Sequence, residues 1–224
     1  MIFSSVNFKG GTGKSTLAQN LAVSFAKGGA KVCLVDADDT AATLDWSEQR
    51  HKREIEPAIV CSLLTNPDSF TSQVRTLYND GGYDILIIDC PPALSPIAVK
   101  AMSISDHLLI PVNTGGGSDI RVTTKLLTEF IKLREIKEDN GGTVQASLIV
   151  NNYKSNAILH ESGIKQMDKL VEHFGIRRLQ TKLHGRVVYG EANSQGYGVV
   201  ELDNAKAKKE LIQLTKEILA LIKS

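Results

Sequence analysis

The sequence has no apolar run approaching the roughly 18 residues that a membrane-spanning helix needs. Its N-terminus also lacks the basic segment and cleavable apolar stretch of a secretory signal. It has only three cysteines, Cys33, Cys61 and Cys90, without the spacing of a metal site, and we interpret them as buried, reduced thiols. These absences argue against a membrane-spanning, secreted or disulfide-stabilised protein and predict a cytoplasmic one.

Internal repeats, low-complexity tracts and a strong net charge are absent too, since the formal net charge of the 224 residues is only +1. The five histidines show no metal or catalytic spacing. Charge is nevertheless uneven: up to Tyr153 there are 14 Lys and Arg against 17 Asp and Glu, and from Lys154 onward 12 against 8. A chain of this length can bury a full sheet between two helical layers, so we expect a single domain over residues 1–224.

The most informative feature that is present is the glycine-rich segment VNFKGGTGKST at Val6 to Thr16. It does not strictly match the ordinary phosphate-loop pattern, GxxxxGK followed by Ser or Thr. It matches KGGxGK followed by Ser or Thr, which has one lysine, Lys9, more than a phosphate loop requires. The glycines let successive backbone N–H groups converge on one anion without Cβ clashes. The segment therefore predicts a nucleotide site, with contacts at Gly10, Gly11, Thr12, Gly13, Lys14, Ser15 and Thr16.

Two residues of this segment have distinct expected roles. Lys14 would neutralise the β and γ phosphates, and the Ser15 hydroxyl would take one Mg²⁺ coordination position. The helix that starts there offers its positive end to the phosphates. The run MIFSSVNF before the loop is β-prone, and STLAQNLAVSFAKGG after it has apolar residues at helical spacing. Strand, loop and helix thus follow in the order that phosphate binding requires.

Acidic residues end two further apolar strands. Asp36 and Asp38 follow the run Val32 to Val35, at the carboxyl edge where open α/β sheets bind ligands. Asp89 follows Ile85 to Ile88 and precedes two prolines, which is typical of a Walker B segment whose aspartate holds Mg²⁺. One such aspartate is weak evidence, but two such strands after a phosphate loop favour a magnesium site.

The rest of the chain alternates strands and helices, which predicts an α/β P-loop NTPase fold with three layers: a mostly parallel central sheet and helices on both faces. The segments Asn113 to Asp119 and Glu138 to Gly142 are expected to be loops. After the first unit we expect strands near Lys31 to Asp36, Ala58 to Leu63, Asp84 to Asp89, His107 to Pro111, Gln145 to Val150 and Arg178 to Leu183. Helices are expected in most gaps, notably Ser118 to Glu138, His160 to Phe174 and Ala205 to Ile222.

Four successive motifs, KGGTGKST, CLVDADD, YDILIIDCPPAL and SDHLLIPV, resemble in order and spacing those of the ParA and MinD group of deviant Walker ATPases. That group partitions plasmids and chromosomes or positions other cellular cargo. The resemblance covers essentially the whole chain. The chain resembles the small plasmid-type members in two respects. There is no room for a helix-turn-helix before Lys9, and the segment LDWSEQR follows the second strand.

The resemblance implies roles for named residues. Lys9 matches the signature lysine that reaches across a dimer to the nucleotide of the other subunit, so that hydrolysis depends on a homodimer formed on ATP binding. Asp38 would orient the attacking water, while Asp36 and Asp89 would support Mg²⁺. Either Asn151 or Asn152 would contact adenine, and the sequence does not decide between them. Arg186 would border the base.

The chain departs from the family pattern in three places. Leu183 and His184 stand near an expected proline, Asp39 and Thr40 replace a Pro-Gln pair, and GGGSDIR replaces a Ser-Pro-Leu-Asp-like run. The last two stretches lie where relatives meet their activator. The resemblance therefore implies a ParB-like or other centromere- or cargo-binding activator whose identity stays open.

ATP-bound relatives coat DNA without sequence preference, which implies a nucleoid-associated protein and gives the basic C-terminal third a use. A membrane-associated regulator of the MinD kind is the main alternative. The closing helix, however, carries one apolar stripe that we expect to pack on the sheet instead of anchoring the protein stably to a membrane. A metabolic ligase with this loop is a further alternative, but the sequence shows no obvious second substrate pocket. The candidate DNA contacts are Lys154, Lys182, Arg186, Lys206, Lys208 and Lys209.

Overall fold

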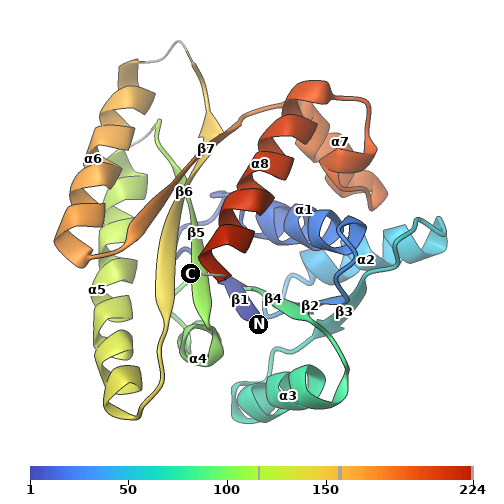
Figure 1. Cartoon of the computed structure of the whole chain (residues 1–224), viewed down its shortest axis with the longest axis horizontal. Coiled ribbons are helices and arrows are strands. Elements are labelled where there is room, and N and C mark those ends of the chain that lie inside the picture. Colours follow the sequence, from blue (N-terminus) through green and yellow to red (C-terminus); the bar gives the residue numbers. More distant parts are fainter. Residues whose placement is uncertain (116, 156–157, 223–224) are drawn as a thin grey trace.

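In the computed structural model, residues 1–115, 117–155 and 158–222 are described. A seven-stranded sheet runs through the molecule in the order β3-β2-β4-β1-β5-β6-β7, and every pair of neighbouring strands is parallel (Figure 1). The strands are β1 (Ile2–Ser5), β2 (Val32–Asp36), β3 (Val60–Leu63), β4 (Ile85–Asp89), β5 (His107–Asn113), β6 (Gln145–Tyr153) and β7 (Arg177–His184).

Helices cover both faces of this sheet, so the predicted three-layer fold is confirmed (Figure 1). Helices α3 to α6 pack on one face and α1, α2, α7 and α8 on the other. The described helices are α1 (Lys14–Lys27), α2 (Ala42–Lys52), α3 (Pro67–Asp80), α4 (Pro96–Ile104), α5 (Gly117–Asp139), α6 (Ile158–Phe174), α7 (Val187–Gln195) and α8 (Ala205–Ile222), with a 3-10 turn at Val199–Glu201.

The central strands are buried on both sides, which explains their continuous apolar runs. All residues of β2 and β4 are buried. Alternate side chains enter the two cores, so that Cys33 and Val35 face one set of helices while Val32 and Leu34 face the other. The reduced thiols of Cys33 and Cys90 are buried as expected, and Cys61 is half-buried.

Several predicted boundaries were wrong by a few residues. β3 begins at Val60 instead of Ala58, and β6 continues to Tyr153. The loop predicted to extend to Asp119 ends earlier because α5 already begins at Gly117, and α5 continues one residue past Glu138. Residue 116 of that loop lies outside the described residues. In each case local glycine content or residue type suggested an end that sheet and helix packing overrode.

Strand order brings the sequence motifs together at one edge of the sheet. β1 lies between β4 and β5, so the loop after β1 leaves from the middle of the sheet. Asp89 is paired in register with Asp36 on one side and with Ser5 on the other. The carboxyl ends of these parallel strands therefore place both predicted acids beside the glycine-rich loop.

Candidate functional site

The glycine-rich loop between β1 and α1 has a backbone that only glycine adopts easily at two positions. Gly11 has φ 73° and Gly13 has φ 90°, both in the left-handed region. A Cβ at Gly13 would also lie 2.3 Å from Nδ2 of Asn151. The spacing of these glycines therefore serves backbone conformation and close packing together.

Two asparagine amides from neighbouring strand ends hold this loop. Asn113, the last residue of β5, donates from Nδ2 to the carbonyl of Gly11 over 3.1 Å, and Asn151 of β6 donates to the carbonyl of Thr12 over 2.7 Å. These two hydrogen bonds tie the loop to β5 and β6. Asn113 was not predicted, although it follows an apolar run in the sequence in the same way as Asn151 does.

Lys14 lies inside the loop at the start of α1. Its side chain is buried, and its Nζ donates to the carbonyl of Lys9 over 3.2 Å. Burial lowers the pKa of Lys14, and the neighbouring carboxylates of Asp89 and Asp38 oppose that shift. The ammonium group therefore sits between the loop and the acidic strand ends, where an anionic ligand and a divalent cation would meet it.

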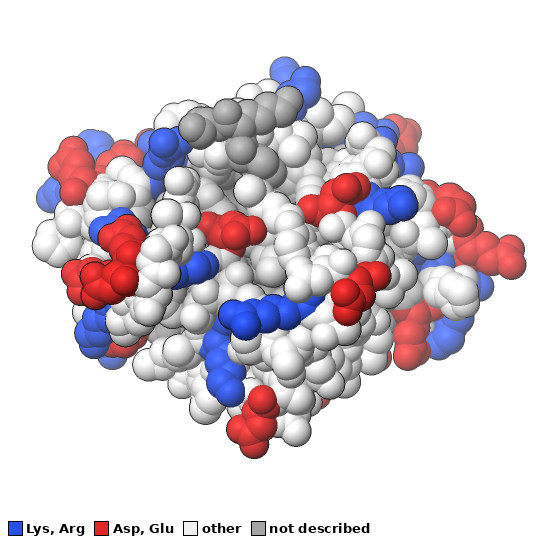
Figure 2. All heavy atoms as spheres, turned by 60° about the horizontal axis from the view of Figure 1, so that its bottom comes forward, with Lys and Arg blue, Asp and Glu red and all other residues white. Residues whose placement is uncertain are grey.

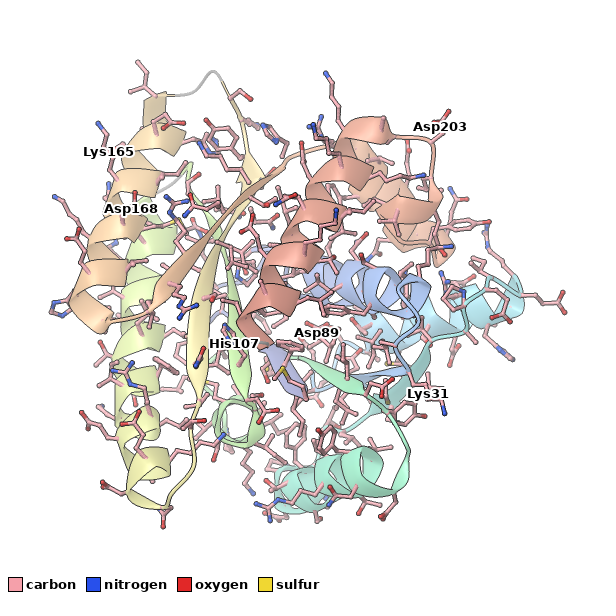
Figure 3. All side chains as sticks on the ribbon, in the orientation of Figure 1. Lys31, Asp89, His107, Lys165, Asp168 and Asp203 are labelled. Carbon is pink, nitrogen blue, oxygen red and sulfur yellow. The ribbon has the colours of Figure 1, made fainter. Side chains whose placement is uncertain are left out.

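Asp89 is almost completely buried, and Figure 3 labels it near the middle of the molecule. Its Oδ2 accepts a hydrogen bond from the Thr43 hydroxyl over 2.7 Å, while Oδ1 is buried and accepts none from the described residues. Burial raises its pKa to about 7, and the hydroxyls of Thr43 and Ser15 oppose that rise. A free carboxylate oxygen beside a serine hydroxyl suits Mg²⁺, which prefers oxygen ligands.

Asp36 and Asp38 are placed differently from each other. Asp36 is fully buried and accepts three backbone hydrogen bonds, from the N–H groups of Asp38, Thr43 and Leu44 at 2.8 to 3.1 Å. Burial still raises its pKa. Asp38 is half-buried, and its Oδ1 accepts from the N–H of Thr40. Asp36 thus holds the start of α2 and the turn that presents Asp38 to the site.

Lys9 points out of its own loop. Its Nζ donates to Ser118 Oγ over 2.8 Å and forms an ion pair with Asp119 at the start of α5. The Lys9 side chain is 33% exposed, whereas that of Asp119 is 4% exposed. Lys9 and Lys14 are only five residues apart, but their side chains point in different directions. Lys14 faces the interior of the loop, and Lys9 faces the start of α5.

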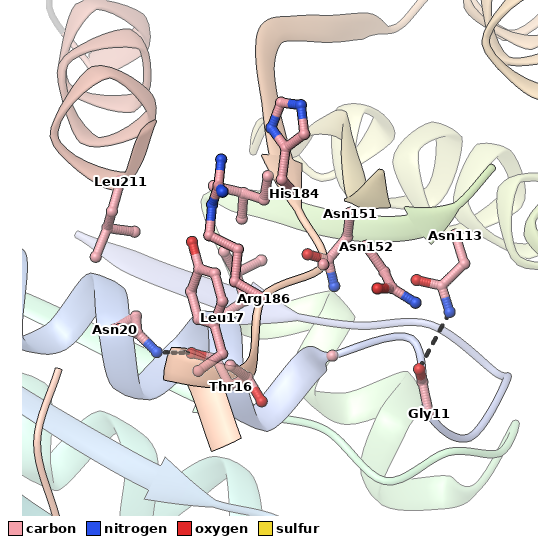
Figure 4. Close-up of a pocket in the computed structure, with 14 residues that line it drawn as sticks. Gly11, Thr16, Leu17, Asn20, Asn113, Asn151, Asn152, His184, Arg186 and Leu211 are labelled. Carbon is pink, nitrogen blue, oxygen red and sulfur yellow. Dashed lines mark hydrogen bonds between the residues drawn. The ribbon is translucent and has the colours of Figure 1, made fainter. Parts of the chain in front are cut away.

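A pocket of about 170 Å³ opens beside the loop (Figure 4). Its walls come from the loop, the start of α1, the ends of β5 and β6, the turn between β7 and α7, and one residue of α8. Because we expect the loop to hold phosphates, the sugar and base of the same nucleotide would enter this pocket. The lining residues are Gly11, Gly13, Thr16, Leu17, Asn20, Asn113, Asn151, Asn152, Leu183, His184, Gly185, Arg186, Tyr189 and Leu211.

The two candidate asparagines are not equivalent in this pocket. One N–H of the Asn151 side-chain amide donates to the carbonyl of Thr12 in the loop. Asn152 is exposed, has a left-handed backbone with φ 50°, and lies with its Oδ1 against Gly185, where a Cβ would come within 2.1 Å. Asn152 therefore lies against the β7–α7 turn, and Asn151 supports the loop.

The β7–α7 turn also supplies Arg186, which lines the pocket. Its Nη2 donates to Glu210 of α8, while its Nε is buried and donates to none of the described residues. The Tyr189 hydroxyl is likewise buried and has no hydrogen-bond partner among the described residues. Neither Tyr189 nor Glu210 was predicted, because their place depends on how α7 and α8 fold back over α1.

The candidate DNA-binding residues do not form one equivalent set. Lys154, Lys206 and Lys209 are exposed, and Lys208 is half-buried. Lys182 lies 3.4 Å from Glu161 and over the Tyr153 ring, and Arg186 faces Glu210, so both of these cations already have acidic partners. The face shown in Figure 2 carries basic and acidic residues interspersed. In the part of the chain that the structure describes, no helix is long and apolar enough to span a membrane.

Comparisons with known proteins agree with this geometry. The chromosome-partitioning ATPase Soj of Thermus thermophilus is 27% identical over 87% of this chain and 85% of its own length. The maintenance of carboxysome distribution protein A of Halothiobacillus neapolitanus is 26% identical over 95% of this chain and 94% of its own. The MinD cell division protein of Aquifex aeolicus shares the fold, with a TM-score of 0.73 at 20% identity over 98% of this chain and 97% of that one.

The family comparison covers nearly the whole fold. Residues 3–210, which include the glycine-rich loop, both acidic strand ends and every pocket-lining residue except Leu211, match the model of the CobQ/CobB/MinD/ParA nucleotide binding domain. The chain therefore belongs to this family and is an ATPase of the ParA/MinD type.

Proposed function

We propose that the protein is an ATP-dependent partition ATPase whose two copies enclose two nucleotides, so that Lys14 serves the ATP of its own chain and Lys9 that of the partner. The direction of Lys9 is the observation that carries this proposal. Its ammonium group leaves the loop that would hold its own phosphates and pairs with Asp119 at the start of α5, where the Lys9 side chain is partly exposed. A cation supplied in this way can stabilise transferring phosphoryl groups by about 10³ to 10⁵ in rate.

The other loop residues complete the proposed site. Ser15 and Asp89 would hold Mg²⁺, which neutralises charge on the phosphates when it is bound. Asp36 would keep α2 and Asp38 in place, and the half-buried Asp38 would orient the attacking water. Asn152 is our candidate for the base contact, since Asn151 already donates to the loop.

Binding to DNA without sequence preference is the second part of the proposal. Two relatives are named for chromosome partitioning and for the maintenance of carboxysome distribution, which supports a role in distributing cargo along the nucleoid. Exposed Lys154, Lys206 and Lys209 would neutralise DNA phosphates. An activator bound to a centromere or other cargo would stimulate hydrolysis and release the monomers.

Gel retardation of unrelated DNA sequences with ATP and Mg²⁺, across a salt series, tests the proposal. We expect retardation by the wild-type protein that weakens steeply as salt rises, and none by Lys9→Ala or Lys14→Ala. Retardation that is unaffected by nucleotide, or none at low salt, would contradict the DNA-bound role. Full ATP binding by Lys14→Ala would contradict the nucleotide assignment itself.

The burial of α8 bears on the MinD-like alternative. Leu211, Leu214 and Ile218 of its apolar stripe are completely buried, Leu221 is half-buried, and the side chain of Ile222 lies outside the described residues. A stripe used for packing is not free to enter a bilayer. ATP-dependent sedimentation of the full chain with anionic liposomes would favour the membrane role over ours.

A further inference from the structure

Glu210, in the second turn of α8, holds the turn between β7 and α7. One carboxylate accepts the backbone N–H of His184 over 3.1 Å, lies 3.0 Å from Nδ1 of the same histidine ring, and accepts a hydrogen bond from Nη2 of Arg186. The Glu210 side chain is 16% exposed. These contacts fix both ends of the three-residue segment 184–186, all of which lines the pocket.

The hydrogen bond between Arg186 and Glu210 determines which N–H donors of Arg186 remain available to a ligand. Arg186 has several N–H donors in a rigid fork, and Glu210 engages the Nη2 end. The Nε of Arg186 and the hydroxyl of Tyr189, both on residues that line the pocket, are buried and have no partner among the described residues. Buried polar groups are nearly always hydrogen-bonded, so these two atoms indicate where a ligand's acceptors would lie.

We propose that Glu210 is a positioning residue for the base and sugar end of the nucleotide. It holds the β7–α7 turn so that Arg186 Nε and the Tyr189 hydroxyl meet acceptors on the ligand, without touching the ligand itself. A group that is orientated in advance loses less freedom on binding, which raises affinity. This inference rests on the proposed function, because it takes the pocket to be the base and sugar site.

The same helix offers a matched control in Glu217. Its carboxylate accepts the N–H groups of Gln180 and Thr181 and the Thr181 hydroxyl, at 2.6 to 3.1 Å. Glu217 therefore ties α8 to β7 much as Glu210 does. None of these partners lines the pocket, however. A purely structural role would make Glu210 and Glu217 behave alike.

Calorimetric titration with two probes separates the roles. MgATP carries base, sugar and phosphates, whereas magnesium tripolyphosphate carries phosphates alone. For Glu210→Gln we expect MgATP affinity to fall about tenfold, and tripolyphosphate affinity to change less than about twofold. Glu217→Gln should bind both probes as the wild type does, even where its melting temperature falls. Tyr189→Phe should weaken MgATP selectively with an unchanged melting temperature.

The outcomes distinguish this inference from the proposed function. Equal losses of both probes in Glu210→Gln, or equal behaviour of Glu210→Gln and Glu217→Gln, would overturn the positioning role while leaving the nucleotide site intact. A wild-type protein that binds neither probe would overturn the nucleotide site and the inference together.

Discussion

The ion pair between Lys9 and Asp119 lies within one chain, whereas we propose that Lys9 contacts the nucleotide of the partner chain. The Asp119 carboxylate is almost fully buried, and its Oδ1 accepts no hydrogen bond from the described residues. Lys9 must leave this acceptor before it reaches a partner's phosphates. The proposed function therefore predicts that this contact competes with dimer formation and favours the single chain.

Asp119→Asn should shift this balance, because it removes the charge that holds Lys9 and keeps the shape of the side chain. If the contact contributes about 1 kcal/mol in each of the two chains, the ATP-dependent dimer should form at about 30-fold lower protein concentration. Sedimentation velocity across a concentration series measures this. Glu129→Gln, which removes an exposed ion pair with Lys132 elsewhere on α5, is the control. An unchanged dimerisation constant would show that the contact does not restrain Lys9.

Asp89 should make the stability of the nucleotide-free protein depend on pH. Burial raises its pKa from 3.8 to about 7 in the folded chain, so the folded state binds a proton that the unfolded state has lost. The stability that Asp89 adds to the folded state is fully present below the pKa of the unfolded chain, and it disappears as pH rises through about 7. Between pH 6 and pH 8 the wild type should lose about 1.4 kcal/mol of unfolding free energy relative to Asp89→Asn.

Urea denaturation without nucleotide or Mg²⁺, at several pH values, measures this difference. Because the variant retains all the other titrating groups, subtracting its curve isolates Asp89. Parallel curves for the two proteins would mean that Asp89 stays ionised in the folded chain.

Sequence motifs predicted the side chains whose roles follow from local spacing, and missed those that depend on distant strands. Lys9, Lys14 and Ser15 share one loop, and Asp89 ends an apolar run, so each was visible in the sequence. Thr43, which donates to Asp89, is 46 residues away in the chain. No local pattern marks such a partner, because only the pairing of β2 with β4 brings it near.

Among the helices, α8 tests whether the closing apolar stripe serves packing. Leu214 is completely buried, and Leu219 on the same helix is 38% exposed. Leu214→Ala should cost about 2 to 5 kcal/mol of unfolding free energy, and Leu219→Ala well under half of that. Chemical denaturation of both variants measures the difference. Similar small losses would mean that the stripe is not part of the core in solution.

Helix starts show why some elements could be delimited from sequence and others could not. Asn66 before Pro67 and Ser95 before Pro96 are ordinary capping signals, and both side chains accept a backbone N–H of α3 and α4. α2 has no such signal: its N-cap is Ala41, with φ 53°. The carboxylate of Asp36 in β2 takes the role of the cap instead.

For the chain as a whole, alternating strands and helices were enough to predict the layers but not the strand order. Apolar runs such as Ile85 to Ile88 indicate a strand buried on both faces. They do not state that β1 lies between β4 and β5, since that order depends on how the crossover helices pack. The order is what brings the loop, Asp36 and Asp89 together.

DNA binding should depend on the exposed lysines of α8 more than on a lysine already paired with an acid. Lys206→Ala with Lys209→Ala should weaken retardation of every DNA sequence alike and reduce the salt slope by about 2. Lys182→Ala is the matched control, because Lys182 faces Glu161 and the Tyr153 ring. Equal effects of the double variant and the control would exclude α8 as the DNA contact.

The central claim is that Lys9 acts across a nucleotide-dependent dimer. Light scattering during size-exclusion chromatography, with Mg²⁺ and a non-hydrolysable ATP analogue, measures it most directly. The wild type should elute at about twice the 24.3 kDa of one chain, and Lys9→Ala should bind the analogue yet remain a single chain. A wild type that stays monomeric with nucleotide bound, or a Lys9→Ala protein that dimerises as fully as the wild type, would contradict the claim.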